Sequence, residues 1–374
     1  MFLQNNIVLI GNSVTEQSKS IAHLKKRVIC IDSFNDADLI GEKYKNNNQY
    51  GLVNSQTINI LKNLKLKKED TLIIVSSDYD QLEDYYEQLE NFGNVIGNNL
   101  ETILKIQNYK NLFSSLSENN IAYPEIYYRE DDINGNAIVK NTFISGGLGV
   151  RKYNQDINFN NFQDNEFCQK LINGLPRSVV FISNQNKEFA IIGLNKIYNK
   201  RTKFTDYCFS GAESNHSISH SELNTLKKYI NFFVKHYNLV GINGIDYINS
   251  DELYFLEVNP RITQTAFLYD NVFEDGFIDA HIQSCLTNIL PIINSNMIKN
   301  HKFETLFAKS SFLFSYDLSS FDFLLNIPEK GVYIEEGQPI CTIFASSGNE
   351  KKTNKLLLDN ILLVKNKLKN IEIT

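Results

Sequence analysis

Apolar and polar positions alternate along the first hundred residues in a way that predicts βα units. Short apolar runs, expected to be strands, alternate with segments whose apolar spacing is helical, such as residues 78–92. Strands that alternate with helices are typical of a parallel sheet covered by helices. We therefore expect residues 1–98 to form a parallel βα domain. The predicted strands are NIVLIG (6–11), RVICID (27–32), TLIIVSS (71–77) and NVIGNN (94–99).

The first turn of this domain resembles a dinucleotide-binding turn only in part. Gly11 stands where the first glycine of G-x-G-x-x-G would be, and Asp32 ends the second strand, where a ribose-binding acid would stand. The two later glycines, which let the backbone approach a pyrophosphate, are missing. The turn therefore favours a scaffold or substrate-side role over dinucleotide binding.

A strand with a lysine, followed by a glycine-rich loop, comes next. A helical pattern over residues 100–120 ends at IAYPEIYY (121–128), and AIVKNTF then carries Lys140 ahead of SGGLG (145–149). Backbone amides of such a loop can close on phosphate oxygens, and a neighbouring lysine supplies a point charge. A flexible β-turn with a surface lysine explains the segment equally well.

Two hairpins and a helix are predicted farther along. SVVFIS (178–183) and EFAIIG (188–193) flank a polar turn, and residues 221–237 show helical spacing with Ser221 as N-cap. The second hairpin joins GINGIDYI (241–248) to LYFLEV (253–258) through residues 249–252. With this turn Ile248 pairs with Leu253, and Asp246 lies opposite Phe255.

This second hairpin carries a candidate metal site. Because side chains alternate, Phe255, Glu257 and Asn259 are expected on the face that carries Asp246, and Asp246 and Glu257 become diagonal neighbours, with β-carbons roughly 7–8 Å apart. Buried like charges need a compensating cation, and Mg²⁺ prefers such oxygen ligands. Two alternatives remain open: Asp246 caps the turn, and Glu257 forms a structural salt bridge with Arg261.

Composition narrows the function classes. The 374 residues carry a formal net charge of -6, which argues against binding nucleic acid or an anionic membrane through a general positive field. No apolar run approaches the ~18 residues of a membrane span, and the N-terminus lacks a signal-peptide pattern, so we expect a cytoplasmic protein. The five cysteines form no C-x-x-C pair, which favours idle thiols over a disulfide framework or a zinc site.

In order along residues 1–290, these segments resemble the ATP-grasp superfamily, ligases that activate a carboxylate as an acyl phosphate. GIDYINSDELYFLEVNPR (244–261) is the specific motif. The resemblance implies ATP and Mg²⁺, with Mn²⁺ as an alternative ion, and an α/β and α+β fold of three parts: a pre-ATP-grasp domain (1–98), an ATP-grasp domain (99–290; lid subdomain about 110–172, large subdomain about 173–290) and a C-terminal β/α extension (291–374) that packs on it.

The resemblance also implies roles for individual residues. It implies metal ligands at Asp246, Glu257 and Asn259, a cation facing the transferred phosphoryl group at Arg261, an ATP-phosphate lysine at Lys140, a flexible lid at Gly146, Gly147 and Gly149, and an adenine-side hinge at Gln169, Lys170 and Leu171. An earlier basic residue of the family falls at Tyr109, with Lys110 adjacent.

The end of the motif separates branches of the superfamily. Biotin carboxylases continue it as NPRLQVEH and use the glutamate as a base toward bicarbonate, whereas this chain reads NPRITQTA, with Thr265 in that place. The I-T-x-T tail is similar to carbamoyl-phosphate-synthetase-like and amino-acid ligase branches. We therefore expect a ligase for a small carboxylate and an amine. A homodimer is expected only because homodimers are the commonest oligomers. The alternatives are carboxylate activation of the carbamoyl-phosphate-synthetase or biotin-carboxylase kind, and a non-catalytic ATP-binding regulatory protein.

Overall fold

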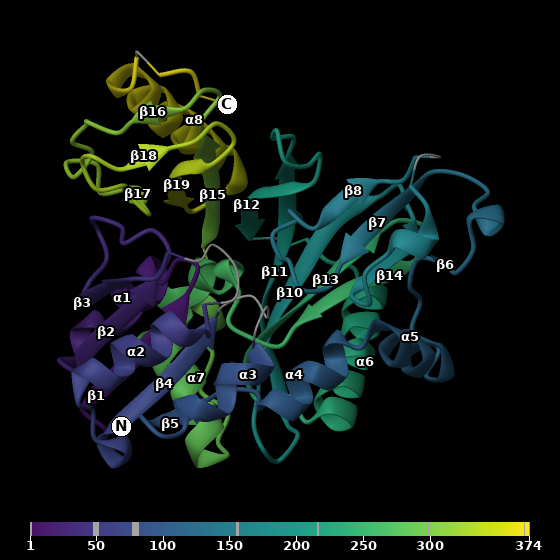
Figure 1. The fold of residues 1–374 in the computed structure, drawn as a ribbon, viewed down its shortest axis with the longest axis horizontal. Helices are drawn as coiled ribbons and strands as arrows, with labels where there is room; N and C mark the ends of the chain where they lie inside the picture. Colours follow the sequence, from purple (N-terminus) through teal and green to yellow (C-terminus); the bar gives the residue numbers. More distant parts are fainter. Residues whose placement is uncertain are drawn as a thin grey trace.

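The structure is a computed structural model that describes residues 2–47, 52–76, 82–154, 157–214, 217–297, 299–369 and 371–373. The start of the helix predicted at 78–92 lies outside the described residues. Figure 1 shows the N-terminal sheet on one side, a lid and a long sheet on the other, and the C-terminal segment above the N-terminal sheet.

The N-terminal part is a five-stranded parallel sheet in the order β3-β2-β1-β4-β5. The predicted parallel βα arrangement is confirmed. The strand β3 was not predicted, because its sequence EKYK has no apolar run. The elements are β1 (Asn6–Gly11), α1 (Thr15–Ile21), β2 (Arg27–Asp32), β3 (Glu42–Lys45), α2 (Ser55–Leu64), β4 (Thr71–Ser76), α3 (Leu82–Leu89) and β5 (Asn94–Ile96).

Two short helices lead into a four-stranded lid sheet. The helical pattern over 100–120 is interrupted at Asn108, whose side chain accepts a hydrogen bond from the Asn111 amide (3.2 Å) and starts a second helix. The lid strands are ordered β6-β9-β7-β8. The elements are α4 (Leu100–Gln107), α5 (Tyr109–Glu118), β6 (Ile126–Tyr127), β7 (Ala137–Asn141), β8 (Val150–Lys152) and β9 (Glu166–Lys170).

The long sheet has eight strands in the order β14-β13-β10-β11-β12-β15-β19-β17. The first predicted hairpin is confirmed, because Ser183 of β10 pairs with Phe189 of β11. Strands of the C-terminal segment extend this same sheet. The strands are β10 (Leu175–Ser183), β11 (Phe189–Lys200), β12 (Cys208–Ser214), β13 (Gly241–Asn249), β14 (Leu253–Asn259), β15 (Asn300–Phe307), β17 (Leu324–Leu325) and β19 (Pro339–Ser347).

Helices cover the long sheet, and a small ribbon of β16 (Phe312–Leu313) and β18 (Tyr333–Ile334) lies beside its C-terminal end. The predicted N-cap at Ser221 is wrong. Ser219, with extended backbone, accepts the Glu222 amide (3.1 Å), so the helix begins before Ser221. The helical segments are α6 (His220–Tyr237), η5 (Gln264–Val272), α7 (Gly276–Thr287) and α8 (Glu350–Lys367).

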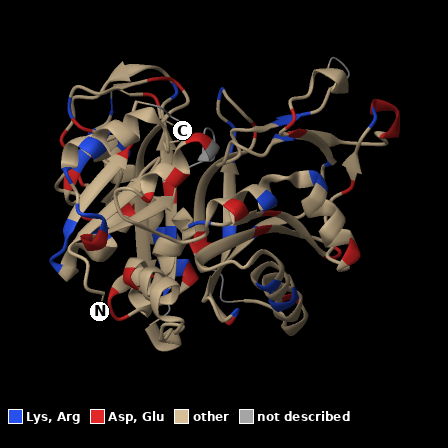
Figure 2. Ribbon diagram, turned by 60° about the horizontal axis from the view of Figure 1, so that its bottom comes forward, with Lys and Arg blue, Asp and Glu red and all other residues tan. Residues whose placement is uncertain are grey.

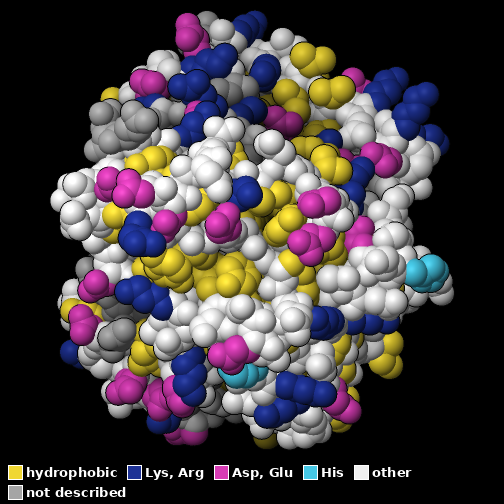
Figure 3. Space-filling view, turned by 90° about the vertical axis from the view of Figure 1, so that its right-hand side faces the viewer, with side chains coloured by type: hydrophobic (Ala, Val, Ile, Leu, Met, Phe, Trp, Pro, Cys, Tyr) yellow, Lys and Arg dark blue, Asp and Glu magenta, His cyan; other side chains and the backbone are white. Residues whose placement is uncertain are grey.

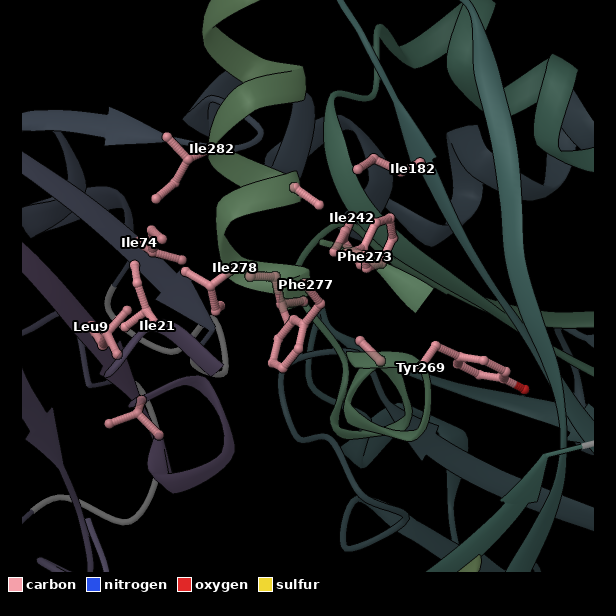
Figure 4. Close-up of a cluster of buried hydrophobic side chains, with 14 of the residues drawn as sticks. Leu9, Ile21, Ile74, Ile182, Ile242, Tyr269, Phe273, Phe277, Ile278 and Ile282 are labelled. Carbon is pink, nitrogen blue, oxygen red and sulfur yellow. The ribbon is translucent and has the colours of Figure 1, made fainter. Parts of the chain in front are cut away.

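One hydrophobic core joins the N-terminal sheet to the long sheet. Figure 4 shows α7 between them, with Leu9 and Ile74 on the N-terminal side and Ile182, Ile242 and Tyr269 on the other. All of these side chains are at most 2% exposed. Because interiors are close-packed and transmit strain, this shared core holds the N-terminal domain in a fixed relation to the β13–β14 hairpin.

Candidate active site

The β13–β14 hairpin has a tighter turn than predicted. Asn249 pairs with Leu253, so the connecting loop is residues 250–252. The predicted pairing of Ile248 with Leu253 is therefore wrong by one residue.

A β-bulge at Leu256 shifts the register a second time. Tyr247 pairs with Phe255, but Asp246 pairs with Glu257, which leaves Leu256 as the extra residue. The two acids are thus direct neighbours rather than diagonal ones. The bulge also turns Phe255 into the core with Tyr247, so the expectation that Phe255 shares the face of Glu257 is wrong.

Asp246, Glu257 and Asn259 form a compact cluster. The Asn259 Nδ2 group donates to Asp246 Oδ2 (3.2 Å) and lies 3.5 Å from Glu257 Oε1. Glu257 is exposed although it stands in an apolar run, so the expectation that both carboxylates are buried is wrong for Glu257. Burial, and then the neighbouring Glu257 carboxylate, raise the pKa of Asp246 well above its ordinary value. The two carboxylates therefore repel each other when both are ionised, and nearby positive charge relieves this repulsion.

Two basic side chains lie near this cluster, one from a strand that precedes the hairpin in the sequence and one from the segment that follows it. Lys140 Nζ lies 3.5 Å from the carbonyl oxygen of Leu256, the bulged residue. Arg261 Nη2 donates to Asn259 Oδ1 (3.3 Å). Both charges favour the ionised form of Asp246. In the described part of the chain Arg261 forms no ion pair with Glu257 within 4 Å, so the structural salt bridge considered from the sequence is not formed.

Lys140 belongs to the inner face of the lid sheet. Lys140 pairs with Phe167, and the same face carries Gln169, whereas Val139 and Cys168 point into a separate small core. Gln169 is fully buried, and its Oε1 atom has no hydrogen-bond partner among the described residues. The lid therefore presents a cation and an unused acceptor on the face that approaches the hairpin.

The backbone of the predicted hinge is already hydrogen-bonded. The Lys170 amide donates to the carbonyl oxygen of Glu125 (2.8 Å), and the Leu171 amide donates to that of Asn136 (2.9 Å). Lys170 is exposed. The amides of Lys170 and Leu171 therefore already have internal partners, and Gln169 adds an unused side-chain acceptor beside them.

The glycine-rich loop is docked on the start of β12. Gly146 and Gly147 have φ angles of +66° and +75°, which favour glycine. The Gly146 carbonyl oxygen accepts the Phe209 amide (2.9 Å), and a Cβ at Gly147 would lie 1.9 Å from the Tyr207 carbonyl oxygen. Among the described residues, no acceptor contacts the amides of Gly146 and Gly147. These amides can therefore bind an anion without breaking an internal bond.

Strand β8, which follows this loop, contacts the connection between β11 and β12 (residues 201–207). Thr205 Oγ1 donates to the Val150 carbonyl oxygen (2.6 Å), and Asp206 forms ion pairs with Lys152 (2.9 Å) and Arg201 (3.0 Å). The lid is thus in contact with the long sheet at its glycine loop and at β8.

An aromatic residue occupies the position of the earlier basic contact. Tyr109 begins α5 and stacks on Phe167, with ring centroids 4.8 Å apart. Lys110 is exposed, and its Nζ lies 5.8 Å from the Tyr109 ring centroid. The inner face of the lid therefore has an aromatic side chain at this position, and Lys110 lies at the surface.

A polar row, which was not predicted from the sequence, continues from the acids across the sheet. Ser178 pairs with Asp246, Asn195 Nδ2 donates to Ser178 Oγ (2.9 Å), and the Tyr269 hydroxyl donates to Asn195 Oδ1 (2.9 Å). The available signal was the polar residues that interrupt apolar strands, Ser178 in PRSVVF and Asn195 in IIGLNK.

The two carboxylates fit a hard cation that shares its coordination with a ligand, and Asn259 could add its Oδ1 atom if its amide, which turns Nδ2 toward the carboxylates, rotated. In the described ranges, no three His, Cys, Asp or Glu side chains are arranged to hold a metal ion by themselves. Two carboxylates and an amide converge instead, and Mg²⁺ is usually held by one or two carboxylates together with phosphate oxygens and water. These residues do not form a transition-metal site made of protein ligands alone.

The surface mixes both signs of charge. Basic side chains are interspersed with acidic ones along the ribbon (Figure 2), and on the face shown in Figure 3 hydrophobic side chains gather near the middle with charged ones around them. Over the residues that the structure describes, no helix is both long and apolar enough to cross a membrane.

Comparison with known proteins identifies the central part of the chain. Residues 106–265 match the family model of the ATP-grasp domain. This range holds the lid, the glycine loop and the whole β13–β14 hairpin, so the chain contains an ATP-grasp domain. The mixed α/β fold, with its N-terminal parallel sheet, matches the folds of a solved biotin carboxylase and a solved N5-carboxyaminoimidazole ribonucleotide synthetase.

One curated relative and two solved structures place the chain further. It is 26% identical over 323 residues to an uncharacterised protein of Methanocaldococcus jannaschii, covering 78% of this chain and 74% of the relative. The biotin carboxylase domain dimer of Hydrogenobacter thermophilus 2-oxoglutarate carboxylase, solved with MgADP and bicarbonate, is 11% identical with a TM-score of 0.72, covering 100% of this chain and 91% of that one. The L-amino acid ligase of Bacillus licheniformis is 12% identical with a TM-score of 0.69, covering 96% and 98%.

Proposed function

We propose that this protein is an ATP-dependent ligase that activates a substrate carboxylate as an acyl phosphate and joins it to an amine. The observation that carries the proposal is the direct opposition of Asp246 and Glu257, with Asn259 beside them and Lys140 and Arg261 at the cluster. Phosphoryl transfer needs little covalent chemistry from the protein, so its main requirements are positioning and charge neutralisation.

We propose ATP and Mg²⁺ as the bound partners. Asp246, Glu257 and Asn259 would hold the ion, for which Mn²⁺ is the alternative, and the ion would neutralise charge on the phosphate oxygens. Gln169 Oε1, buried and without a partner in the described chain, supplies an acceptor for the adenine amino group. The MgADP bound to the Hydrogenobacter domain supports this choice.

The basic groups and the glycine loop bind different parts of the reacting groups in the proposed reaction. Lys140 and the open amides of Gly146 and Gly147 hold the β and γ phosphates. Arg261 stabilises the charge on the phosphoryl group as it moves to the carboxylate oxygen. The amine then attacks the acyl carbon, and phosphate leaves. Contact of the lid with β12 excludes water, which would otherwise hydrolyse the acyl phosphate.

The surroundings of Thr265 argue against base-assisted activation of bicarbonate. Thr265 is 6% exposed, and its hydroxyl lies 2.9 Å from the Thr263 hydroxyl. A buried threonine paired in this way has no proton-accepting group for bicarbonate. A non-catalytic ATP-binding protein is the other alternative, and it would have no need for Arg261 at the cluster.

A phosphate-release screen tests the proposal. Pairs of small carboxylates and amines, with bicarbonate among the acids, are incubated with MgATP, and products are identified by mass spectrometry. The proposal predicts that one acid and amine pair together raise phosphate release and give an amide. Equal release with and without every pair would favour a binding protein. The homodimer stays a prediction, which sedimentation would check.

A further inference from the structure

Asn98, a residue of the N-terminal domain, is hydrogen-bonded to both ends of the β13–β14 hairpin. Its Nδ2 group donates to the Pro260 carbonyl oxygen (2.9 Å) and to Asn243 Oδ1 (2.7 Å), and its Oδ1 accepts the Val240 amide (2.9 Å). The residue is 6% exposed. Its side-chain amide thereby ties the start of β13 to the segment that follows β14.

The bond to Pro260 matters because Arg261 comes next in the chain. Within the described residues, the guanidinium group of Arg261 makes two long hydrogen bonds, at 3.3 Å to Asn259 Oδ1 and 3.5 Å to the Ile262 carbonyl oxygen. Its Nε atom is buried without a partner among the described residues, and Arg261 and Asn98 both line a small cavity. The guanidinium group is therefore placed by its backbone more than by its own bonds.

His281 also lines this cavity, and both of its ring nitrogens already have polar contacts. Its Nδ1 accepts the Ile242 amide (2.9 Å), and its Nε2 lies 3.5 Å from the Ile96 carbonyl oxygen. Burial lowers the pKa of His281 to about 4, so the ring is neutral near neutral pH and does not repel Arg261. The ring thus fixes β13 while leaving the Asn98 amide as the polar contact to the backbone of Pro260.

We propose that Asn98 is a positioning residue for Arg261, through which the N-terminal domain sets the place of the cation at the transferred phosphoryl group. The inference rests on the proposed ligase function and assigns the N-terminal domain a part in it. A misplacement of about 1 Å in such a group costs roughly a hundredfold in rate. Loss of the Asn98 amide should therefore lower turnover while ATP still binds.

The test compares Asn98→Ala with a matched control, Tyr86→Phe. The Tyr86 hydroxyl donates to the Asn98 carbonyl oxygen (2.7 Å), so the control removes a neighbouring buried bond and keeps the Asn98 amide. We expect Asn98→Ala to lower kcat by about ten- to a hundredfold with KM for MgATP within about twofold. The control should keep both constants within about twofold, and Asn98→Ala added to Arg261→Ala should cause no further loss.

An equal loss in the Arg261→Ala background would overturn the proposal, because Asn98 would then act without Arg261. A second readout does not depend on activity: the NMR signal of the Arg261 Nε–H group, assigned by its disappearance in Arg261→Lys. It should move or broaden in Asn98→Ala and in the milder Asn98→Ser, and stay in place in Tyr86→Phe. An unmoved signal contradicts the proposal. Absent turnover in the wild type contradicts the ligase function alone.

Discussion

Asp246 and Glu257 lie directly opposite each other on adjacent strands, with the Asn259 amide 3.2 Å from one carboxylate and 3.5 Å from the other. Like charges in this arrangement destabilise a sheet by roughly 0.2–1 kcal/mol when nothing compensates them. The protein therefore accepts a cost in stability at this position, which the proposed bound cation would remove.

Glu257→Gln, which keeps the shape of the side chain and removes its charge, should separate stability from activity. We expect ATP turnover to fall at least about a hundredfold, since several kcal/mol of charge stabilisation would be lost. In EDTA the variant should be more stable than the wild type by roughly 0.2–1 kcal/mol. Wild-type turnover at saturating Mg²⁺, measured by phosphate release, would disprove the assignment of Glu257 as a ligand.

Lys140→Met should lower kcat/KM for MgATP by about a hundredfold or more, because a fixed charge at the phosphates would be lost. Lys110→Ala is the matched control, since Lys110 is exposed over the Tyr109 ring. It should change kcat/KM by less than about twofold. If Lys110→Ala had the larger effect, the phosphate contact would belong to the start of α5 and not to β7.

Gly147→Ala should open the lid, whereas Gly146→Ala should only strain it. Both positions have positive φ, which costs an alanine about 1–2 kcal/mol. At Gly146 a Cβ would meet nothing within 4 Å, but at Gly147 it would lie 1.9 Å from the Tyr207 carbonyl oxygen. We therefore expect a higher KM for MgATP and faster lid proteolysis in Gly147→Ala than in Gly146→Ala. Indistinguishable variants would show that the loop does not rest on β12 in solution.

Two buried groups should give opposite pH dependences of stability. Burial raises the pKa of Asp32 to about 6, so the folded state keeps a proton that the unfolded chain loses, and this contribution is lost as pH rises from about 4 to 6. Burial lowers the pKa of His281 to about 4, so its contribution is lost as pH falls from about 6.5 to 4. Each change amounts to about 3 kcal/mol.

Urea unfolding of Asp32→Asn and His281→Asn between pH 4 and 6.5 checks these signs. The unfolding free energy of Asp32→Asn relative to the wild type should rise with pH, and that of His281→Asn should fall. Two parallel difference curves would mean that one of the groups does not titrate as a buried side chain.

The alternation of apolar residues predicted most of the sheet strands but not the details of the site hairpin. The shorter turn and the bulge at Leu256 each shift the pairing by one residue, and neither changes the apolar pattern. Together the two shifts move the pairing by two residues. Because side chains alternate with a period of two, Asp246, Glu257 and Asn259 still share a face. Phe255 lies before the bulge and was therefore assigned to the wrong side.

Long-range contacts explain the other gaps. The Asn98 side chain reaches residues more than 140 positions away, a separation that no local pattern encodes. The polar strand β3 forms because β2 offers it a parallel edge. The resemblance to ATP-grasp proteins, by contrast, could be established from local motifs, because the glycine loop and the FLEVNPR run keep their order along the chain.

The proposed reaction requires that the γ-phosphoryl group pass to a carboxylate oxygen. Its most direct test uses the acid found in the phosphate-release screen, labelled with ¹⁸O in the carboxyl group, together with its amine, MgATP and unlabelled water. We predict one ¹⁸O atom in each released phosphate and one lost from the amide product, because the acyl-phosphate bridging oxygen leaves with phosphate. Released phosphate without ¹⁸O, in the presence of amide formation, would contradict the account.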